Sequence, residues 1–267
     1  MDDLKRYEEL VKTVEYHNDR YYNQDDPEIS DYDYDMMMKE LKKIEKDHPE
    51  YVTPNSPTQH VGGSAKREAG VLVRHRVPML SLQDVFSKEE VQDFVKSMQE
   101  TLVDPVFVVE YKIDGLSMAL RYENGLLTTA ITRGDGIIQG EDVTVNAKVI
   151  KDVKNKLKEP IEYLEVRGEV YMTNEAFDKV NEIQELNNKK TFANPRNCAA
   201  GTLRQLDSRI TKQRNLSMFI FNIQDIRGKE ITSHSQGYEY LKIQGMKVID
   251  NYQVCHNFEE VWKAIEM

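Results

Sequence analysis

The dipeptide Asn124-Gly125 constrains the fold of this chain more than any other feature of its sequence. It separates two largely apolar runs, at residues 116–121 and 126–132. An Asn-Gly pair between such runs is the strongest local signal for a β-hairpin, because the two-residue turn needs positive φ angles that these residues tolerate. The sequence therefore predicts two antiparallel strands here, around which a larger sheet can form.

Two further segments predict strands of the same sheet. Residues 165–172 alternate charged side chains with small or apolar ones, and residues 216–226 form a long, nearly continuous apolar run. Such a run is typical of a strand with neighbours on both sides, so we expect it to be central. Helices are predicted to begin near Ser87, Thr173, Ser235 and Asn257. This mixture predicts an α+β fold with a mixed, largely antiparallel sheet.

The front of the chain predicts a pair of helices. Apolar side chains recur at helical spacing through residues 2–23, and the Asp26-Pro27 dipeptide ends that pattern. Ser30, followed by Asp33 three residues later, has the spacing of a capping box that starts a second helix. We expect the two helices to pack against each other in antiparallel orientation.

A domain boundary is predicted shortly after the second helix. Residues 51–65 contain Pro and Gly without any periodicity, which is typical of a linker. We therefore predict a helical module over residues 1–65 and a second domain over residues 66–267. A chain of 267 residues is long enough for a full core in the second domain.

The composition excludes several classes of protein. The formal net charge of −10 argues against a protein that coats nucleic acid by charge alone, although basic residues are enriched over residues 185–215. No run approaches the ~20 apolar residues of a membrane span. Cys198 and Cys255 have no metal-ligand spacing. We therefore expect a cytoplasmic protein without a membrane partner or a structural metal.

The best candidate for chemistry is a lysine near the end of an apolar run. Residues 106–115 are predicted to form one strand, in which Glu110, Lys112 and Asp114 share a face and Gly115 permits a tight turn. A lysine there can bind a phosphate or attack an electrophile. Attack requires a neutral amine, so neighbouring cations or burial must favour loss of the proton. A solvated strand end is the more common explanation of so short a pattern.

Three later stretches also place charges among structural residues. They are Thr-Arg-Gly-Asp-Gly at residues 132–136, Glu-Val-Arg-Gly-Glu at residues 165–169, and two arginines among small side chains at residues 194–204. Each has a plain structural explanation, as a loop, an edge strand or a tightly packed short helix. The sequence contains no Walker loop and no dinucleotide fingerprint, so these stretches and the lysine carry the functional argument.

Taken in order, these stretches resemble the NAD-dependent DNA ligase family. Residues 110–115 look like its nucleotidyl-transfer motif, and the three later stretches match its following signatures. The front of the chain matches as well, at residues 26–35, 54–59 and 77–82. The combined set spans essentially the whole chain and is far more specific than any single motif. The resemblance implies an ATP-grasp-like nucleotidyltransferase (adenylation) domain behind a small helical module.

The resemblance implies that Lys112 is the nucleophile of an adenylation reaction. It would attack the α-phosphate of NAD, release nicotinamide mononucleotide (NMN) and keep AMP as a phosphoramide, with magnesium as the metal cofactor. Glu110 would meet the adenine amino group, and Arg133 and Glu169 would hold ribose and phosphate. The remaining contacts of this half of the site would come from Ser81, Leu82 and Asp114.

The resemblance also implies that the helical module holds the NMN half. Tyrosine rings can stack on a cationic nicotinamide ring, and carboxylates four residues apart on a helix can accept ribose hydroxyls. The residues implied are Tyr21, Tyr22, Asp31, Tyr32, Asp33, Tyr34 and Asp35. Packing of the two helices is the alternative role for the tyrosines. Arg196 and Arg204 would bind the 5′-phosphate of nicked double-stranded DNA.

The family's last nucleotidyl-transfer motifs and its later domains have no counterpart before Met267. We therefore expect a monomeric N-terminal fragment of a DNA replication and repair enzyme, which self-adenylates at best very slowly and seals no nicks alone. Two alternatives stay open: an ATP- or GTP-dependent nucleotidyltransferase of the RNA ligase or capping type, and a non-catalytic NAD-binding domain. The tyrosine-bearing front module favours NAD, because enzymes that use ATP or GTP have no nicotinamide half to hold.

Overall fold

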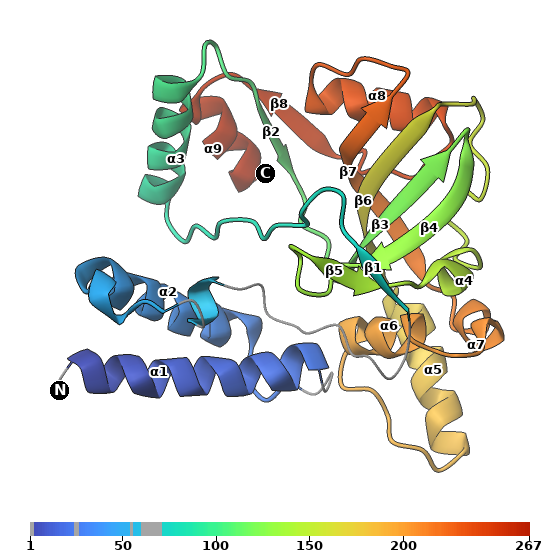
Figure 1. Cartoon of the computed structure of the whole chain (residues 1–267), viewed down its shortest axis with the longest axis horizontal. Helices are drawn as coiled ribbons and strands as arrows, with labels where there is room; N and C mark the ends of the chain where they lie inside the picture. Colours follow the sequence, from blue (N-terminus) through green and yellow to red (C-terminus); the bar gives the residue numbers. More distant parts are fainter. Residues whose placement is uncertain (1–2, 24–26, 54–55, 60–70) are drawn as a thin grey trace.

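The front of the chain is a pair of packed helices (Figure 1). A computed structural model describes residues 3–23, 27–53, 56–59 and 71–267. Helix α1 (Asp3–Asn18) continues into a π-helical turn, η1 (Asp19–Asn23), and is followed by α2 (Asp31–Asp47). The Ser30 hydroxyl accepts a hydrogen bond from the Asp33 backbone N–H at 3.1 Å, which confirms the predicted cap. The buried residues between the helices are Tyr7, Leu10, Val14 and Leu41.

Part of the predicted linker packs against these helices. Two 3-10 turns, η2 (Pro49–Tyr51) and η3 (Pro57–Gln59), follow α2. The buried Tyr7 hydroxyl lies 2.7 Å from the Ser56 hydroxyl and donates to Glu45 at 3.1 Å. Buried polar groups need partners of this kind, so the segment around Ser56 is held to the helical module.

The centre of the second domain is a four-stranded antiparallel sheet. Strands β3 (Leu116–Glu123) and β4 (Leu126–Thr132) form the predicted hairpin, with φ angles of 50° at Asn124 and 78° at Gly125. The other strands are β6 (Tyr163–Tyr171) and β7 (Ser217–Arg227), and the order is β4-β3-β6-β7. All pairings between strands of the described chain are antiparallel, which confirms the predicted α+β fold.

The predicted place of the long apolar strand is wrong. Strand β7 lies at the edge of the four-stranded sheet, and its outer neighbour is only an isolated bridge between Ile220 and Val248. Its apolar residues pack against α8 (His234–Ile243) instead, where a Cβ on Gly237 would lie 3.4 Å from Ile223 Cδ1. The run is therefore apolar because a helix packs against the strand, and not because the strand has a second partner strand.

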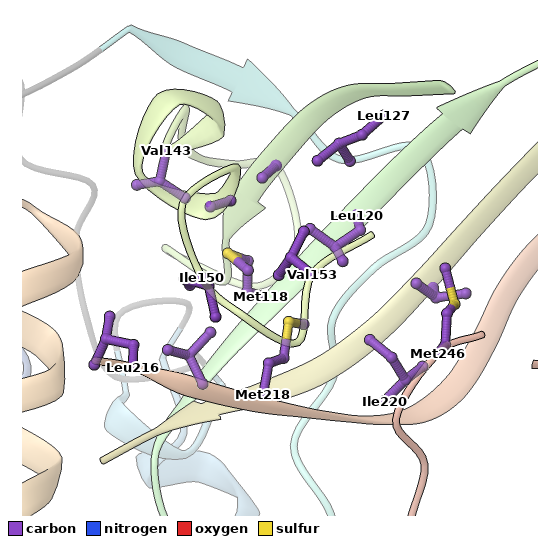
Figure 2. Close-up of a cluster of buried hydrophobic side chains, with 14 of the residues drawn as sticks. Met118, Leu120, Leu127, Val143, Ile150, Val153, Leu216, Met218, Ile220 and Met246 are labelled. Atoms are coloured by element: carbon purple, nitrogen blue, oxygen red, sulfur yellow. The ribbon is translucent and has the colours of Figure 1, made fainter. Parts of the chain in front are cut away.

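One large core supports the sheet (Figure 2). Met118 and Leu120 of β3 and Met218 and Ile220 of β7 point into it. Since side chains alternate along a strand, the even-numbered residues of β6, such as Val166 and Val170, enter this core. The odd-numbered residues of β6 face the other side of the sheet. Four short helices accompany the sheet: α4 (Thr144–Ala147), α5 (Asn174–Leu186), α6 (Pro195–Leu203) and α7 (Ser208–Gln213).

The predicted lysine strand is shorter than expected. Strand β2 (Phe107–Glu110) pairs with β8 (Tyr252–Cys255), and Glu110 opposite Tyr252 is the last pair. Residues 111–114 have no ladder partner and Tyr111 is 65% exposed, so they connect two sheets. Gly115 does permit a close approach, because a Cβ there would overlap the carbonyl oxygen of Val170. This small sheet packs with α3 (Lys88–Thr101) and α9 (Phe258–Glu266).

A third sheet was not predicted. Strands β1 (Leu72–Arg74) and β5 (Gln139–Glu141) pair over three residues each, too few to show a periodic pattern. This ladder fixes the start of the segment that leads to Ser81. Among the described residues, no helix has the length and apolar character needed to cross a membrane.

Candidate active site

Lys112 lies on the exposed connection between β2 and β3, close to a carboxylate of the main sheet. That carboxylate belongs to Glu169, which faces Ser117 of β3 and accepts a hydrogen bond from its hydroxyl at 3.2 Å. Burial raises the pKa of Glu169, while the positive charge of Lys112 and the Ser117 hydrogen bond oppose this rise. The charges of Arg167 and Arg196 act in the same direction as that of Lys112. Three cations therefore gather around one carboxylate.

Arg167 is a site residue that the sequence analysis missed. It lies two residues before Glu169 on the same face of β6, donates to the Ser117 hydroxyl at 3.0 Å and donates to the Leu80 carbonyl at 2.9 Å. Burial and the charge of Arg133 together lower the pKa of Arg167 to about 10, against the opposing effect of Glu169. The alternation of charges over residues 165–169 was the available signal. The proposed edge strand is wrong for that stretch, because β6 lies between β3 and β7.

Arg133 and Ser81 lie together, from segments 52 residues apart. The Arg133 guanidinium donates to the Ser81 hydroxyl at 2.8 Å, and the Arg133 carbonyl lies 2.8 Å from His75 Nε2. The segment carrying Ser81 is anchored at buried Met79, whose backbone N–H donates to the Gly136 carbonyl at 2.6 Å. The next predicted residue, Leu82, has an exposed fraction of 71%. Ser81 thus lies on the cationic edge of the site.

The two arginines of α6 have different surroundings. Arg196, in the first turn, lies with its guanidinium carbon 4.0 Å from the ring centroid of Tyr21 and its Nε 3.8 Å from Asp114 Oδ1. Arg204, at the end of the helix, has its Nε 3.5 Å from Glu141 Oε2. Arg196 therefore joins the helical module to the lysine segment, while Arg204 contacts β5.

Glu110 ends β2 and faces α8. Its Oε2 accepts a hydrogen bond from the Tyr238 hydroxyl at 2.6 Å and lies 3.4 Å from His234 Nε2. Neither of these α8 residues was predicted as part of the site, because the sequence gives no signal for a contact across more than 120 positions.

The helical module contributes a shallow hollow. Its lining residues are His17, Tyr21, Pro27, Glu28, Ile29, Ser30 and Tyr34. The Tyr34 hydroxyl donates to Asn18 Oδ1 at 2.6 Å, so this tyrosine also ties α2 to α1. Of the other predicted clamp residues, Tyr32 is exposed and Asp35 is half-buried on α2. The Asp33 carboxylate accepts from the Ser30 hydroxyl at 2.6 Å.

Two predicted clamp residues have side chains that lie outside the described part of the structure. They are Tyr22, within η1, and Asp31, the first residue of α2. A metal cage was not predicted, and the described residues include no group of three His, Cys, Asp or Glu that could hold an ion. The cluster of Lys112, Arg133, Arg167 and Arg196 suits an anionic ligand such as a phosphate group.

The sequence matches two families over almost its entire length. Residues 70–267 match the NAD-dependent DNA ligase adenylation domain, and residues 1–62 match the DNA ligase-like, N-terminal NAD+-binding domain. Three relatives named DNA ligase illustrate the similarity. The protein from Clostridium kluyveri is 54% identical over 265 residues, which are 99% of this chain and 40% of that protein.

The other two relatives match nearly the same part of this chain. The protein from Caldicellulosiruptor saccharolyticus is 52% identical over 264 residues, covering 98% of this chain and 39% of that protein. The protein from Clostridioides difficile is 47% identical over 258 residues, covering 96% and 38%. This chain therefore spans about 40% of the length of the curated relatives that it matches. On the evidence of both matched domains, the chain belongs to the NAD-dependent DNA ligase family.

Proposed function

We propose that this chain carries out the adenylation step of an NAD-dependent DNA ligase. Lys112 Nζ would form a bond to the α-phosphorus of NAD, the bond from that phosphorus to the bridging oxygen would break, and the electron pair would leave with NMN. The observation that supports this most is the gathering of Lys112, Arg167 and Arg196 around Glu169, with Arg133 next to Arg167. Fixed cations of this kind stabilise the charge of a phosphoryl group in transfer.

Each neighbour of Lys112 has a role in this proposal. Arg133 and Arg167 bind the pyrophosphate oxygens, and their positive charge offsets the negative charge of the phosphoryl group in transfer. Glu169 accepts the ribose hydroxyls, and Asp114 holds Arg196 at the entrance through the contact at 3.8 Å. Contacts to the adenosine half come from Ser81, Leu82 and Glu110, and Glu110 accepts the adenine amino group.

The helical module would bind the NMN half of the dinucleotide. Tyr21 and Tyr34 line the hollow of this module, and an aromatic face attracts a cationic ring such as nicotinamide. The further candidates of the clamp are Tyr22, Asp31, Tyr32, Asp33 and Asp35. Because Arg196 contacts Tyr21, it can meet the phosphates of the dinucleotide as well as the 5′-phosphate for which the sequence analysis named it.

The step that follows adenylation, transfer of AMP to DNA, is proposed for the whole ligase. AMP would pass from Lys112 to the 5′-phosphate of nicked double-stranded DNA, with Arg204 as a contact of that phosphate, as DNA replication and repair require. Magnesium would be held mainly by the phosphates of the substrate, since Mg²⁺ in nucleotide sites commonly keeps few protein ligands. We propose a monomeric, cytoplasmic protein.

An ATP- or GTP-dependent nucleotidyltransferase is the alternative that the lysine alone would allow. Titration calorimetry with NAD, NMN and ATP separates the two functions. We expect NAD to bind more tightly than ATP, and NMN to bind measurably without an adenosine half, because the helical module has its own subsite. Tighter binding of ATP than of NAD would refute the proposed function.

A further inference from the structure

Helix α8 closes the site behind Glu110. The Tyr238 hydroxyl donates to Glu110 Oε2 at 2.6 Å, and His234, one helical turn earlier, lies 3.4 Å from the same oxygen. Tyr238 is only 1% exposed, whereas the Glu110 side chain is 23% exposed. Within the described part of the chain, Glu110 Oε1 makes no hydrogen bond. One carboxylate oxygen is therefore engaged by the protein, and the other is available to a ligand.

The donor is itself firmly held. The Tyr238 ring centroid lies 4.5 Å from that of His234 and 5.2 Å from that of Tyr252, the residue that pairs with Glu110 across β2 and β8. Burial raises the pKa of Tyr238, and the hydrogen bond to Glu110 raises it further, so the hydroxyl keeps its proton. The second acceptor nearby, the Phe221 carbonyl, is more distant at 3.3 Å. A short hydrogen bond to a carboxylate is among the strongest neutral-to-charged contacts in proteins.

We propose that Tyr238 is a positioning residue that fixes the Glu110 carboxylate and so makes the site select a 6-amino purine over a 6-oxo purine. This inference rests on the proposed function, in which Glu110 accepts the adenine amino group. With Oε2 held by Tyr238, the carboxylate cannot rotate freely, and Oε1 presents an acceptor in one direction. An adenine N–H can donate to that oxygen, whereas the oxygen of a 6-oxo purine is repelled by it.

Loss of the Tyr238 hydroxyl should weaken this selection through two effects, one on the 6-amino purine and one on the 6-oxo purine. A freely rotating carboxylate must be ordered when adenine binds, which lowers affinity for NAD. The same freedom lets the carboxylate turn away from a 6-oxo group, which removes part of the repulsion. The ratio of the two affinities is thus a more specific measure than either affinity alone.

The test is titration calorimetry with NAD and with nicotinamide hypoxanthine dinucleotide, in which the amino group is replaced by an oxo group. In Tyr238→Phe we expect the preference for NAD to fall about tenfold, the scale of one hydrogen bond to a charged group. Tyr240→Phe is the matched control, because Tyr240 is a buried tyrosine of the same helix whose hydroxyl accepts a hydrogen bond from the Gln244 side-chain amide at 2.8 Å. Its preference should equal that of the wild type.

A double-mutant cycle shows whether Tyr238 acts through Glu110. In a Glu110→Gln background, Tyr238→Phe should change the preference much less than in the wild type, because the carboxylate is already gone. His234→Ala supplies a second variant at a more exposed position and should lower the preference in the same direction by a smaller factor. An unchanged preference in Tyr238→Phe would overturn the inference.

The proposed function and this inference fail in distinguishable ways. If the wild type binds neither NAD nor NMN, the proposed function fails. If the wild type binds NAD and forms the Lys112 adduct, but Tyr238→Phe retains the full preference for NAD, only the role of Tyr238 fails. Binding of NMN alone should be the same in the wild type and in Tyr238→Phe, because that ligand contains no purine.

Discussion

Replacing Arg121 by leucine should destabilise the chain by about 3–5 kcal/mol, the usual effect of leaving a buried ion without its partner. The Arg121 guanidinium donates to Glu165 Oε2 at 2.9 Å, and the two side chains are 7% and 0% exposed. It also donates to the Arg74 carbonyl at 2.9 Å, which joins β1 to the main sheet. Without it, the Glu165 carboxylate keeps only the Tyr163 hydroxyl, at 2.6 Å, as a donor among the described residues.

Urea and thermal unfolding, followed by far-ultraviolet circular dichroism, measure this change. At about 2 °C per kcal/mol for a chain of this size, the expected decrease in Tm is about 6–10 °C. Leucine at both Arg121 and Glu165 should restore most of the lost stability, because no unpaired charge remains. Lys179→Leu, which breaks an exposed pair with Glu175 at 2.6 Å, should leave Tm almost unchanged, because solvent screens such a pair. A single Arg121 variant within about 1 kcal/mol of the wild type, or a double variant less stable than the single one, would refute the reasoning.

Three further predictions concern the site. Burial raises the pKa of Glu169, so the folded state binds this proton more tightly than the unfolded state does. The wild type therefore loses stability as pH rises from the ordinary carboxyl range towards the raised pKa. In urea unfolding at a series of pH values, Glu169→Gln should gain stability relative to the wild type over that interval, and a constant difference would contradict the burial argument. In calorimetry, Tyr21→Leu should weaken NMN binding several-fold and leave AMP binding unchanged, because the Tyr21 ring lies in the helical module against Arg196. Equal losses for both ligands would indicate a structural role. Arg204→Ala, placed in a whole ligase, should preserve adenylation and impair AMP transfer to nicked DNA in a gel assay, since Arg204 lies at the far end of α6 against Glu141 of β5. Loss of adenylation would place it at the NAD phosphates.

The features predictable from the sequence are those set by local chemistry. The Asn124-Gly125 turn has the positive φ angles that its residues favour, and Ser30 caps α2 through its own hydroxyl. Both follow from interactions within four residues of the chain. The family motifs also give the approximate place of Lys112, because they are contiguous in sequence.

The features that could not be predicted depend on distant partners. The strand that was predicted to include Lys112 ends at Glu110, because its antiparallel partner β8, more than 140 residues later, begins opposite it at Tyr252. Strand β7 lies at the edge of its sheet, and its sequence is nevertheless apolar because α8 packs against it. The contacts of Tyr238 likewise require the packing of α8 against β2, which no local pattern records.

Mass spectrometry of the intact chain after prolonged incubation with NAD and magnesium tests the central claim most directly. The account predicts an increase of about 329 Da, the mass of an adenylyl group, which survives denaturation and maps to Lys112. The increase should be absent in Lys112→Arg, which keeps the positive charge, and present in Lys148→Ala, which removes an exposed lysine beyond α4. An adduct that persists in Lys112→Arg or maps to another residue, or a wild-type chain that forms none, would contradict the account.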